Sequence, residues 1–227
     1  MRHTQDEIFC AHEGDEWFDR NRGALEKFDS SFDLPSVLIN YYGLKPKRIL
    51  EVGAANGFRL AALRERYECK VVAVEASDKA IADGKVKFPF VDFTKGVAHD
   101  ISLRDSFDLI IVNFVFHWID RSNLLKCVSE IDRLLGNKGF LIIGDFFPSN
   151  FVKVRYHHLP QQEVYTYKQN YAAVFLASGL YHAVAALTSH HATIELSSEV
   201  PEDERTSVCL LQKELSDHYT EFVMPLR

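Results

Sequence analysis

The sequence predicts an α/β fold with a seven-stranded sheet, mostly parallel with an antiparallel last strand, and helices on both faces. From residue 47 onward, apolar strand-like segments alternate with helical patterns, which is the order of a parallel sheet with right-handed crossovers. Residues 107–113 (FDLIIVN) are almost continuously apolar, as in a central strand covered on both sides. The last two predicted strands, 180–188 and 205–213, have no helical pattern between them, so we expect them to pair antiparallel.

The remaining elements follow from local patterns in chain order. Strands are also predicted at 48–53, 69–75, 95–100 and 138–145, and helices at 15–27, from Leu34 onward, at 57–67, 77–87, 124–135 and 167–179. Pro35 suits the first turn of its helix, and Ser77 or Asp78 suits an N-cap. Leu124 and Ile131 belong to one apolar helix face, and Gly136 stands where a C′ glycine ends a helix.

Composition excludes several classes of protein. The chain has 227 residues, of which 47% are hydrophobic, and 26 basic against 32 acidic side chains give a formal net charge of −6. A disordered chain is less apolar, and nucleic-acid binding needs a clustered basic surface that is absent here. The N-terminus has no signal-peptide core, and the apolar stretch 174–187 is too short to span a membrane. We expect a cytoplasmic monomer or homodimer without nucleic-acid or membrane partners.

The cysteine and histidine spacings do not predict a metal site. Four cysteines are far apart and none forms a CxxC pair, so free thiols in a reducing compartment are expected. The adjacent pair His190-His191 has no cysteine or carboxylate at a convincing ligand spacing. We interpret this pair as part of a solvent-facing loop.

Polar and small residues follow the predicted strands where those strands end. The segment EVGAANG (51–57) ends the first strand with two glycines, which permit a tight turn and close backbone approach to a ligand. Glu75 ends the second strand, Asp100 the third and Asn113 the fourth. Ligands of open α/β sheets bind at these carboxyl ends, and a carboxylate such as Glu75 accepts hydrogen bonds from both ribose hydroxyls. The pattern therefore predicts a nucleoside site.

The ordered segments ILEVGAANG, VVAVEAS, VAHDI, FDLIIVNFVFHWI and LLGNKGFLIIGD resemble the motifs of class I S-adenosylmethionine-dependent methyltransferases. The resemblance spans roughly residues 47–145, and the antiparallel strand pair extends it to about residue 213. It implies a Rossmann-like methyltransferase sheet, S-adenosylmethionine as cofactor and no metal. In the family's first loop, acidic-x-Gly-x-Gly-x-Gly, Glu51, Gly53 and Gly57 match, whereas Ala55 replaces the middle glycine.

The resemblance also implies roles for single residues. Gly53 and its neighbours line the methionine part of the cofactor, Glu75 binds the ribose diol, Asp100 flanks the adenine, and Asn113 lies near the transferable methyl. The full set expected from the strand ends is Glu51, Gly53, Ala54, Ala55, Gly57, Glu75, Ala76, Asp100, Ile101 and Asn113. We expect a single domain, with a helical cap at 1–46, a cofactor-binding core at 47–145, and an acceptor insert with the C-terminal strands at 146–227.

A dinucleotide-binding dehydrogenase is the main competing class. Its G-x-G-x-x-G fingerprint would require glycine at Ala55 and a small residue at Phe58, and the sequence has neither. The acidic residue Glu75 fits both classes. Asp100 and the expected antiparallel last strand favour the methyltransferase.

His117 is the candidate general base, because a hydroxyl or amine acceptor loses a proton during methyl transfer. It stands in the segment Phe116-His117-Trp118 after the fourth strand, and Phe116 and Trp118 are candidate acceptor contacts. We favour the alternative that His117 packs beside its aromatic neighbours at the sheet–helix junction. Turnover by a His117→Asn variant separates the two.

The aromatic, basic segment 146–167 lies where related enzymes build their acceptor pocket. Arg155, His157 and His158 within it are candidate contacts for an anionic acceptor such as a sugar phosphate. The alternative is a solvated loop whose aromatic residues cover the sheet edge, and the sequence does not separate the two.

The N-terminal segment 13–22 resembles the opening of small methyltransferases of bacterial surface-sugar pathways, including those associated with pseudaminic acid synthesis. That resemblance implies that Trp17, Phe18 and Arg22 close over the cofactor, with Arg22 near its carboxylate. The alternative is an amphipathic helix packed through Trp17 and Phe18.

These patterns predict an S-adenosylmethionine-dependent methyltransferase acting on a small-molecule acceptor. The leading expectation is O-methylation of a sugar or surface-glycan pathway metabolite. Carboxyl methylation is the second, because FVFHW resembles the corresponding segment of such enzymes. A cofactor-binding partner subunit without turnover is the third, and the departure at Ala55 keeps it open.

Overall fold

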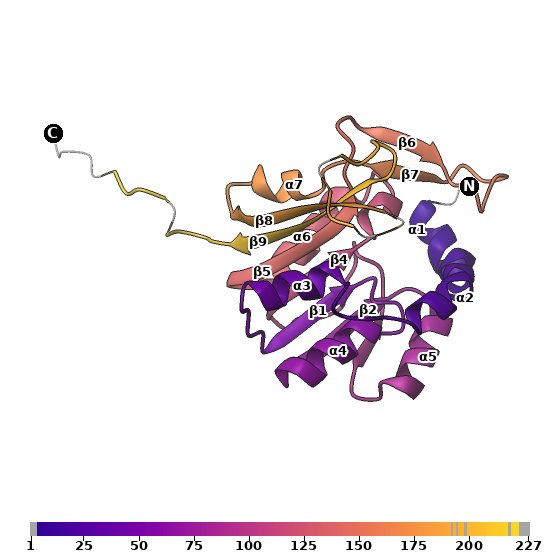
Figure 1. The fold of residues 1–227 in the computed structure, drawn as a ribbon, viewed down its shortest axis with the longest axis horizontal. Coiled ribbons are helices and arrows are strands. Elements are labelled where there is room, and N and C mark those ends of the chain that lie inside the picture. The colour runs from indigo at the N-terminus through magenta and orange to yellow at the C-terminus, as the bar shows by residue number, and fades with distance from the viewer. Residues whose placement is uncertain (1–3, 192, 194, 198, 218, 223–227) are drawn as a thin grey trace.

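The computed structural model describes residues 4–191, 193, 195–197, 199–217 and 219–222. Its main feature is a seven-stranded sheet of order β3-β2-β1-β4-β5-β9-β8 (Figure 1). These strands are β1 (Arg48–Val52), β2 (Lys70–Glu75), β3 (Asp92–Lys95), β4 (Phe107–Asn113), β5 (Leu135–Phe146), β8 (Tyr181–His190) and β9 (Arg205–Lys213). The first five pair in parallel, whereas β9 pairs antiparallel with both β5 and β8. The predicted fold class is confirmed.

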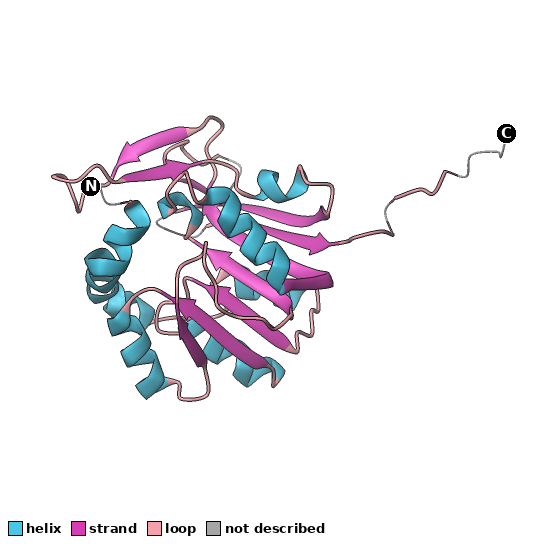
Figure 2. Cartoon of the chain, turned by 180° about the vertical axis from the view of Figure 1, so that it is seen from behind, coloured by secondary structure: helices cyan, strands magenta, loops and turns pink. Residues whose placement is uncertain are grey.

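Helices cover both faces of this sheet (Figures 1 and 2). On one face, α3 (Leu34–Tyr41) and α4 (Phe58–Tyr67) bury leucines and an isoleucine against β1, β2 and β4. On the other face, α6 (Leu124–Leu134) and α7 (Ala172–Leu176) pack on β4, β5 and β9. Burial of such side chains stabilises each by about 1.5–3 kcal/mol, so the two apolar layers hold the strand ends in fixed positions.

Local signals explain where several helices begin. Helix α5 (Asp78–Lys87) starts after Ser77, whose hydroxyl accepts from the backbone N–H of Ala80 at 3.0 Å. Helix α3 starts after Asp33, whose carboxylate caps Ser36, and Pro35 lies in its first turn. Both starts agree with the sequence, because hydroxyl and carboxylate caps satisfy N–H groups that a first turn leaves unpaired.

The N-terminal segment forms three consecutive helical pieces: α1 (Gln5–Ile8), the π-helical η1 (Phe9–Glu13) and α2 (Gly14–Leu25). The predicted helix at 15–27 is confirmed as α2, whereas α1 and η1 were not predicted. Figure 1 shows this segment beside the carboxyl ends of β1 and β2. The segment 146–167 contributes β6 (Val152–Arg155), which pairs antiparallel with β7 (Tyr165–Lys168), and η2 (Phe116–Trp118) follows β4.

The third strand was placed too late in the sequence. We expected 95–100, but β3 covers Asp92–Lys95, where Phe93 and Thr94 pair with β2. The Gly96 N–H donates to the Glu75 carbonyl at 3.0 Å, and the chain then turns, with the Asp100 N–H bonded to the Val97 carbonyl. Residues 96–100 are therefore a turn that lies over the strand end.

Two other expectations are wrong in detail. The helix expected at 167–179 is limited to α7, because Tyr165, Thr166 and Tyr167 pair with β6 in a strand. Gly136 does not end α6 in a left-handed conformation: the helix ends at Leu134, and Gly136 already lies within β5. The left-handed residue of this connection is Lys138, with φ 65°.

Candidate functional site

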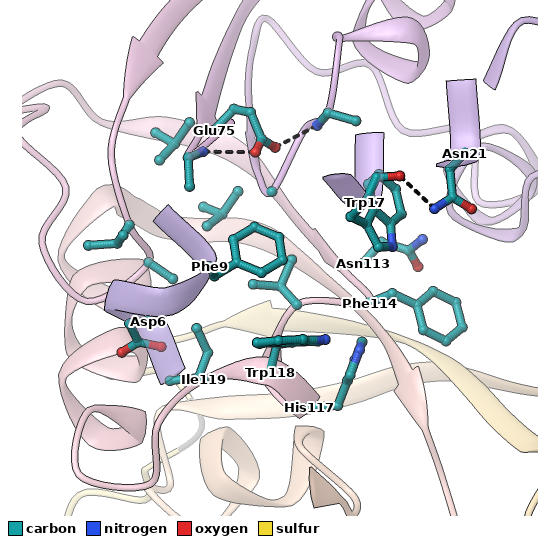
Figure 3. A pocket seen from close by; sticks show the side chains of 18 of the residues that line it. Asp6, Phe9, Trp17, Asn21, Glu75, Asn113, Phe114, His117, Trp118 and Ile119 are labelled. Carbon is teal, nitrogen blue, oxygen red and sulfur yellow. Dashed lines mark hydrogen bonds between the residues drawn. The ribbon is translucent and has the colours of Figure 1, made fainter. Parts of the chain in front are cut away.

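A cavity of about 450 Å³ lies at the carboxyl ends of the parallel strands, between the strand-end loops and the N-terminal helices (Figure 3). Cavities of this size are typical of small-molecule sites. Its walls are the turn after β1, the ends of β2 and β4, η2, the end of β5, and the inner side of α1, η1 and α2. The residues that line it include Phe9, Trp17, Asn21, Leu25, Gly53, Ala55, Arg59, Glu75, Ala76, Asn113, Phe114, His117, Trp118, Phe146 and His191.

Every second residue from 53 to 57, in the turn after β1, has a left-handed backbone: φ is 73° at Gly53, 49° at Ala55 and 79° at Gly57. A Cβ atom at Gly53 would collide with a methyl group of Val115. Position 53 therefore requires glycine for two reasons: its backbone is left-handed, and there is no space for a Cβ atom. Ala55, which replaces the family's middle glycine, occupies a conformation that costs an L-residue about 1–2 kcal/mol.

Glu75 lies at the end of β2 with its carboxylate held by three backbone N–H groups. Its Oε2 accepts from Ala55 at 2.8 Å, and its Oε1 accepts from Ala76 at 2.8 Å and Ser77 at 2.9 Å. Burial raises the pKa of Glu75, although the three amides oppose that shift by stabilising the anion. A carboxylate has about four acceptor sites, and the site left on Oε2 suits a ribose hydroxyl.

Glu51 lies beneath the same turn and outside the cavity lining. It pairs with Arg59, whose Nε and Nη2 also bind the carboxylate of Asp33 at 2.9 and 2.8 Å. Burial raises the pKa of Glu51 to about 7 against the opposing charge of Arg59, and the carboxylates of Asp33 and Glu75 add to it. Its Oε2 is buried without a hydrogen-bond partner among the described residues.

The end of β4 supplies a further wall residue, Asn113. Asn113 carries a buried amide oxygen without a partner in the described part of the chain. S-Adenosylmethionine carries an ammonium group, and the unpaired amide oxygen of Asn113 in the cavity wall is the kind of acceptor that would receive one. Together with the Glu75 carboxylate, this acceptor shows that the residues present fit the cofactor.

His117 lies in the cavity wall and is hydrogen-bonded to Asp145, which lies outside the lining. The Nδ1 of His117 lies 3.0 Å from Oδ1 of Asp145, and the backbone N–H of His117 donates to Oδ2 at 3.1 Å. Asp145 is 3% exposed and His117 12%. The carboxylate can only accept, so Nδ1 carries the proton and Nε2 is left as the acceptor atom. Figure 3 shows the His117 ring between Trp118 and Phe114.

The N-terminal helix α2 presents a stripe of one residue per turn to the cavity, namely Trp17, Asn21 and Leu25. Of the expected residues, Trp17 lines the cavity. Phe18 is fully buried on another side of α2, and Arg22 lies over its ring and 3.6 Å from Asp83. Phe18 and Arg22 therefore fasten the helix rather than line the cavity.

The segment α1 is bound across the cavity mouth by Gln5. Its amide nitrogen donates to the carbonyls of Trp118 and Tyr165 at 2.8 and 3.0 Å, and its amide oxygen accepts from the Tyr165 N–H at 2.7 Å. Farther along, buried Glu13 accepts from Arg20 and from the Tyr156 hydroxyl. Two hydrogen-bonded sites thus connect the N-terminal segment to η2 and the β6–β7 hairpin.

The structure brings together eight of the predicted residues on the cavity wall: Trp17, Gly53, Ala55, Glu75, Ala76, Asn113, His117 and Trp118. Eleven lie outside the lining: Phe18, Arg22, Glu51, Ala54, Gly57, Asp100, Ile101, Phe116, Arg155, His157 and His158. Asp100 is exposed and Ile101 is buried in the core, because the turn 96–98 occupies the wall instead. Phe116 stacks on Tyr171 in the core with ring centroids 5.2 Å apart.

The sequence analysis missed several residues of the site. Asp145, which binds His117 from outside the lining, ends the predicted strand 138–145, so the rule applied to the other strand ends would have found it. The stripe on α2 could have been predicted from its spacing of four residues. No local sequence pattern predicts that Phe9 and Phe146 line the cavity. His191, interpreted as solvent-facing, is exposed as expected and in addition lines the cavity.

Among the described residues, no helix is long and apolar enough to cross a membrane. In the same part of the chain, no group of three or more His, Cys, Asp or Glu side chains is arranged to hold a metal ion.

Residues 50–143 match the family model described as a methyltransferase domain. An uncharacterized methyltransferase of Alkaliphilus oremlandii is 23% identical over 53% of this chain and 55% of its own length. A malonyl-[acyl-carrier protein] O-methyltransferase of Halorhodospira halophila is 24% identical over 48% of this chain and 38% of its own. This chain thus spans about half or less of the curated relatives it matches.

The fold is shared with a solved structure over almost the whole chain. The 1,6-didemethyltoxoflavin-N1-methyltransferase of Burkholderia thailandensis, crystallised with 1,6-didemethyltoxoflavin and S-adenosylhomocysteine, has a TM-score of 0.68 and 15% identity, covering 94% of this chain and 92% of that one. The matched family model, the sheet and the strand-end site define residues 50–143 as a methyltransferase domain of the S-adenosylmethionine-dependent class. S-Adenosylmethionine is its cofactor.

Proposed function

We propose that this protein transfers the methyl group of S-adenosylmethionine to a hydroxyl or N–H group of a small-molecule acceptor. The observation that carries the proposal is the His117–Asp145 pair, which holds an imidazole in the cavity wall with Nε2 as an acceptor. A histidine so oriented removes the proton that an acceptor hydroxyl or N–H must lose.

Different residues of this chain have separate roles in the proposed reaction. Glu75 and the turn at Gly53 and Ala55 hold the cofactor, which supplies the methyl group. His117 accepts the acceptor's proton at Nε2, and Asp145 fixes the ring and stabilises the imidazolium formed. The N-terminal helices close the cavity on the remaining side, which excludes water and fixes the reacting groups.

Carboxyl methylation, the activity in the name of the Halorhodospira halophila relative, is the second candidate. A carboxylate acceptor has no proton to lose near neutral pH, and it benefits from a cation in the site. Arg59 is the only Lys or Arg among the described lining residues, and it already binds Asp33 and Glu51. This electrostatics supports the protic acceptor over the carboxylate.

A sugar hydroxyl, suggested by the resemblance of the N-terminal segment, is one acceptor of the proposed kind. The residues expected to bind its anionic group do not support it, because Arg155, His157 and His158 lie on β6 and the following turn, outside the cavity lining. The proposal therefore includes sugar hydroxyls without assigning a phosphate subsite.

Cofactor binding is tested by calorimetric titration with S-adenosylmethionine and S-adenosylhomocysteine. We expect Glu75→Ala to weaken both roughly 10- to 100-fold, because a hydrogen bond to a carboxylate, worth about 1.5–3 kcal/mol, is lost. Asp100→Ala removes an exposed carboxylate that lies outside the cavity lining, and it should change affinity less than twofold. Equal effects of the two substitutions would contradict the assignment of Glu75.

The role of His117 as general base is tested by measuring turnover of the His117→Asn variant. The acceptor for this assay is found by screening compounds for S-adenosylhomocysteine release. We expect a loss of about 10²- to 10⁴-fold, the usual contribution of a general base, with cofactor affinity within threefold of the parent. Near-normal turnover would assign His117 to packing. Cofactor binding without turnover on any acceptor would favour a non-catalytic partner subunit.

A further inference from the structure

Four aromatic rings form a continuous cluster in the cavity wall. Phe114 follows β4, His117 lies in η2, Phe146 ends β5, and His191 follows β8. The centroids of Phe114–Phe146, Phe114–His191, His117–Phe146 and Phe146–His191 are 5.6, 5.4, 5.2 and 5.0 Å apart. We call these four residues the ring cluster. All four line the cavity.

The backbone of Phe114 is strained in a way that sets its ring in this cluster. Phe114 has φ 56°, a left-handed conformation that is rare for a bulky side chain. Its N–H donates to the Gly144 carbonyl at 2.7 Å, which holds the turn in place. Such strain costs about 1–3 kcal/mol and persists where the surrounding structure imposes it, most often at functional sites. Glycine at this position would relieve the strain but would remove the ring from the cluster.

The ring cluster belongs to a longer aromatic wall. Trp118 and Phe9 continue it, with ring centroids 5.2 Å apart, and Trp17 faces them from α2 (Figure 3). Partial burial lowers the pKa of His191, whose side chain is 46% exposed, with Glu204 opposing and Lys168 and His117 adding to the shift. The neutral form of this imidazole is thereby favoured, and a neutral ring serves as a stacking surface.

A flat π system is the ligand that such a wall recognises. Stacked and edge-to-face ring pairs are worth about 0.5–1.5 kcal/mol each beyond their buried area. An aliphatic chain gains no such term, and an anionic acceptor finds no uncommitted Lys or Arg among the described lining residues.

We propose that the methyl acceptor is a planar aromatic or heteroaromatic molecule that stacks against the ring cluster and presents its O–H or N–H to Nε2 of His117. The inference rests on the proposed function and narrows its substrate class. In the reaction, the acceptor's O–H or N–H bond breaks and its proton passes to Nε2. An O–CH₃ or N–CH₃ bond forms as the C–S bond of the cofactor breaks, and S-adenosylhomocysteine leaves.

The test is binding of two planar probes, 7-hydroxycoumarin and 4-hydroxyquinoline, measured by calorimetry with the full chain saturated in S-adenosylhomocysteine. UDP-glucose and octanoate represent sugar and carboxylate acceptors. We expect the planar probes to bind at least tenfold more tightly than the other two. Phe146→Leu keeps apolar bulk but removes a ring face, and it should weaken planar-probe binding roughly 3- to 10-fold.

Phe140→Leu is the matched control, because Phe140 lies on the same strand but packs in the opposite core. It should leave planar-probe binding unchanged, and S-adenosylhomocysteine should bind all three proteins alike. Absence of planar-probe binding, tighter binding of UDP-glucose or octanoate, or equal effects of the two substitutions would overturn the proposal. If S-adenosylhomocysteine itself fails to bind the parent protein, the proposed function fails first, so the two failures are distinguishable.

Discussion

The backbone N–H of Ala55 donates a 2.8 Å hydrogen bond to Oε2 of Glu75, which fastens the turn after β1 to the end of β2. The turn and the carboxylate come from neighbouring parallel strands, and this bond makes them one unit. The geometry of Glu75 therefore depends on a residue that occupies a costly backbone conformation, with φ 49°.

Ala55→Gly should stabilise the protein. Relief of the left-handed strain, about 1–2 kcal/mol, is partly offset by the greater entropy of glycine in the unfolded chain, about 0.5–1 kcal/mol. The expected net gain is up to about 1 kcal/mol, measured by urea denaturation. Ala54→Gly is the control: Ala54 is buried and not left-handed, so it should lose stability. Destabilisation by Ala55→Gly would show that the turn is not strained.

Local sequence determined much of this fold. The strand at 107–113 and the last strand at 205–213 have the predicted bounds, because continuous apolar runs between polar residues mark buried strands. The third strand was misplaced because its end is set by the Gly96 N–H bond to Glu75, a contact between two strands that local patterns do not report.

The site was predictable where strand ends define it and not where distant segments meet. Glu75 and Gly53 stand at strand ends, and both line the cavity. Phe9 and His191 reach it from opposite ends of the sequence, through packing of η1 and through the β8–β9 connection. Their positions depend on tertiary contacts, so motif spacing cannot place them.

The pH dependence of stability should contain a signature of Glu51. Burial raises the pKa of its carboxyl from 4.5 to about 7, so the folded state keeps a proton that the unfolded state releases. This contribution is fully present below pH 4.5 and is lost as the pH rises to about 7. Between these values the free energy of unfolding should fall by roughly 1–3 kcal/mol.

Glu51→Gln should flatten that slope in urea denaturation series between pH 5 and 7. Part of the slope should remain, because the pKa of Glu75 is raised as well. Glu130→Gln, at a carboxylate whose pKa is lowered by its bond to Arg133, should leave the slope unchanged. An unaltered slope in Glu51→Gln would mean that Glu51 is ionised throughout this range.

Asp145 and His117 should act as one unit in catalysis. Asp145→Asn leaves a side chain that can donate to Nδ1 and favour the wrong tautomer, so we expect kcat to fall about 10- to 1,000-fold. Residues of one catalytic unit are not additive. The double variant Asp145→Asn/His117→Asn should therefore be no slower than His117→Asn alone. Multiplicative losses would assign Asp145 a separate structural role.

Gln5 should control closure of the N-terminal segment. Gln5→Ala removes three hydrogen bonds to Trp118 and Tyr165, each worth about 0.5–1.5 kcal/mol. We expect S-adenosylhomocysteine to bind roughly 5- to 30-fold more weakly, with faster amide exchange over residues 5–13. The exposed Gln161→Ala is the control and should change neither measurement. If amide exchange became faster but the affinity for S-adenosylhomocysteine did not change, cofactor binding would not depend on the order of the N-terminal segment.

The placement of β9 has a consequence for biosynthesis. This strand is made after β5 and β8, yet it lies between them and supplies the hydrogen-bond partners for both. Until residue 213 has left the ribosome, a nascent chain presents two apolar strand edges with nothing to join them. Such edges attract other chains, so we expect the nascent protein to need chaperone protection late in translation and chains stopped before Arg205 to aggregate.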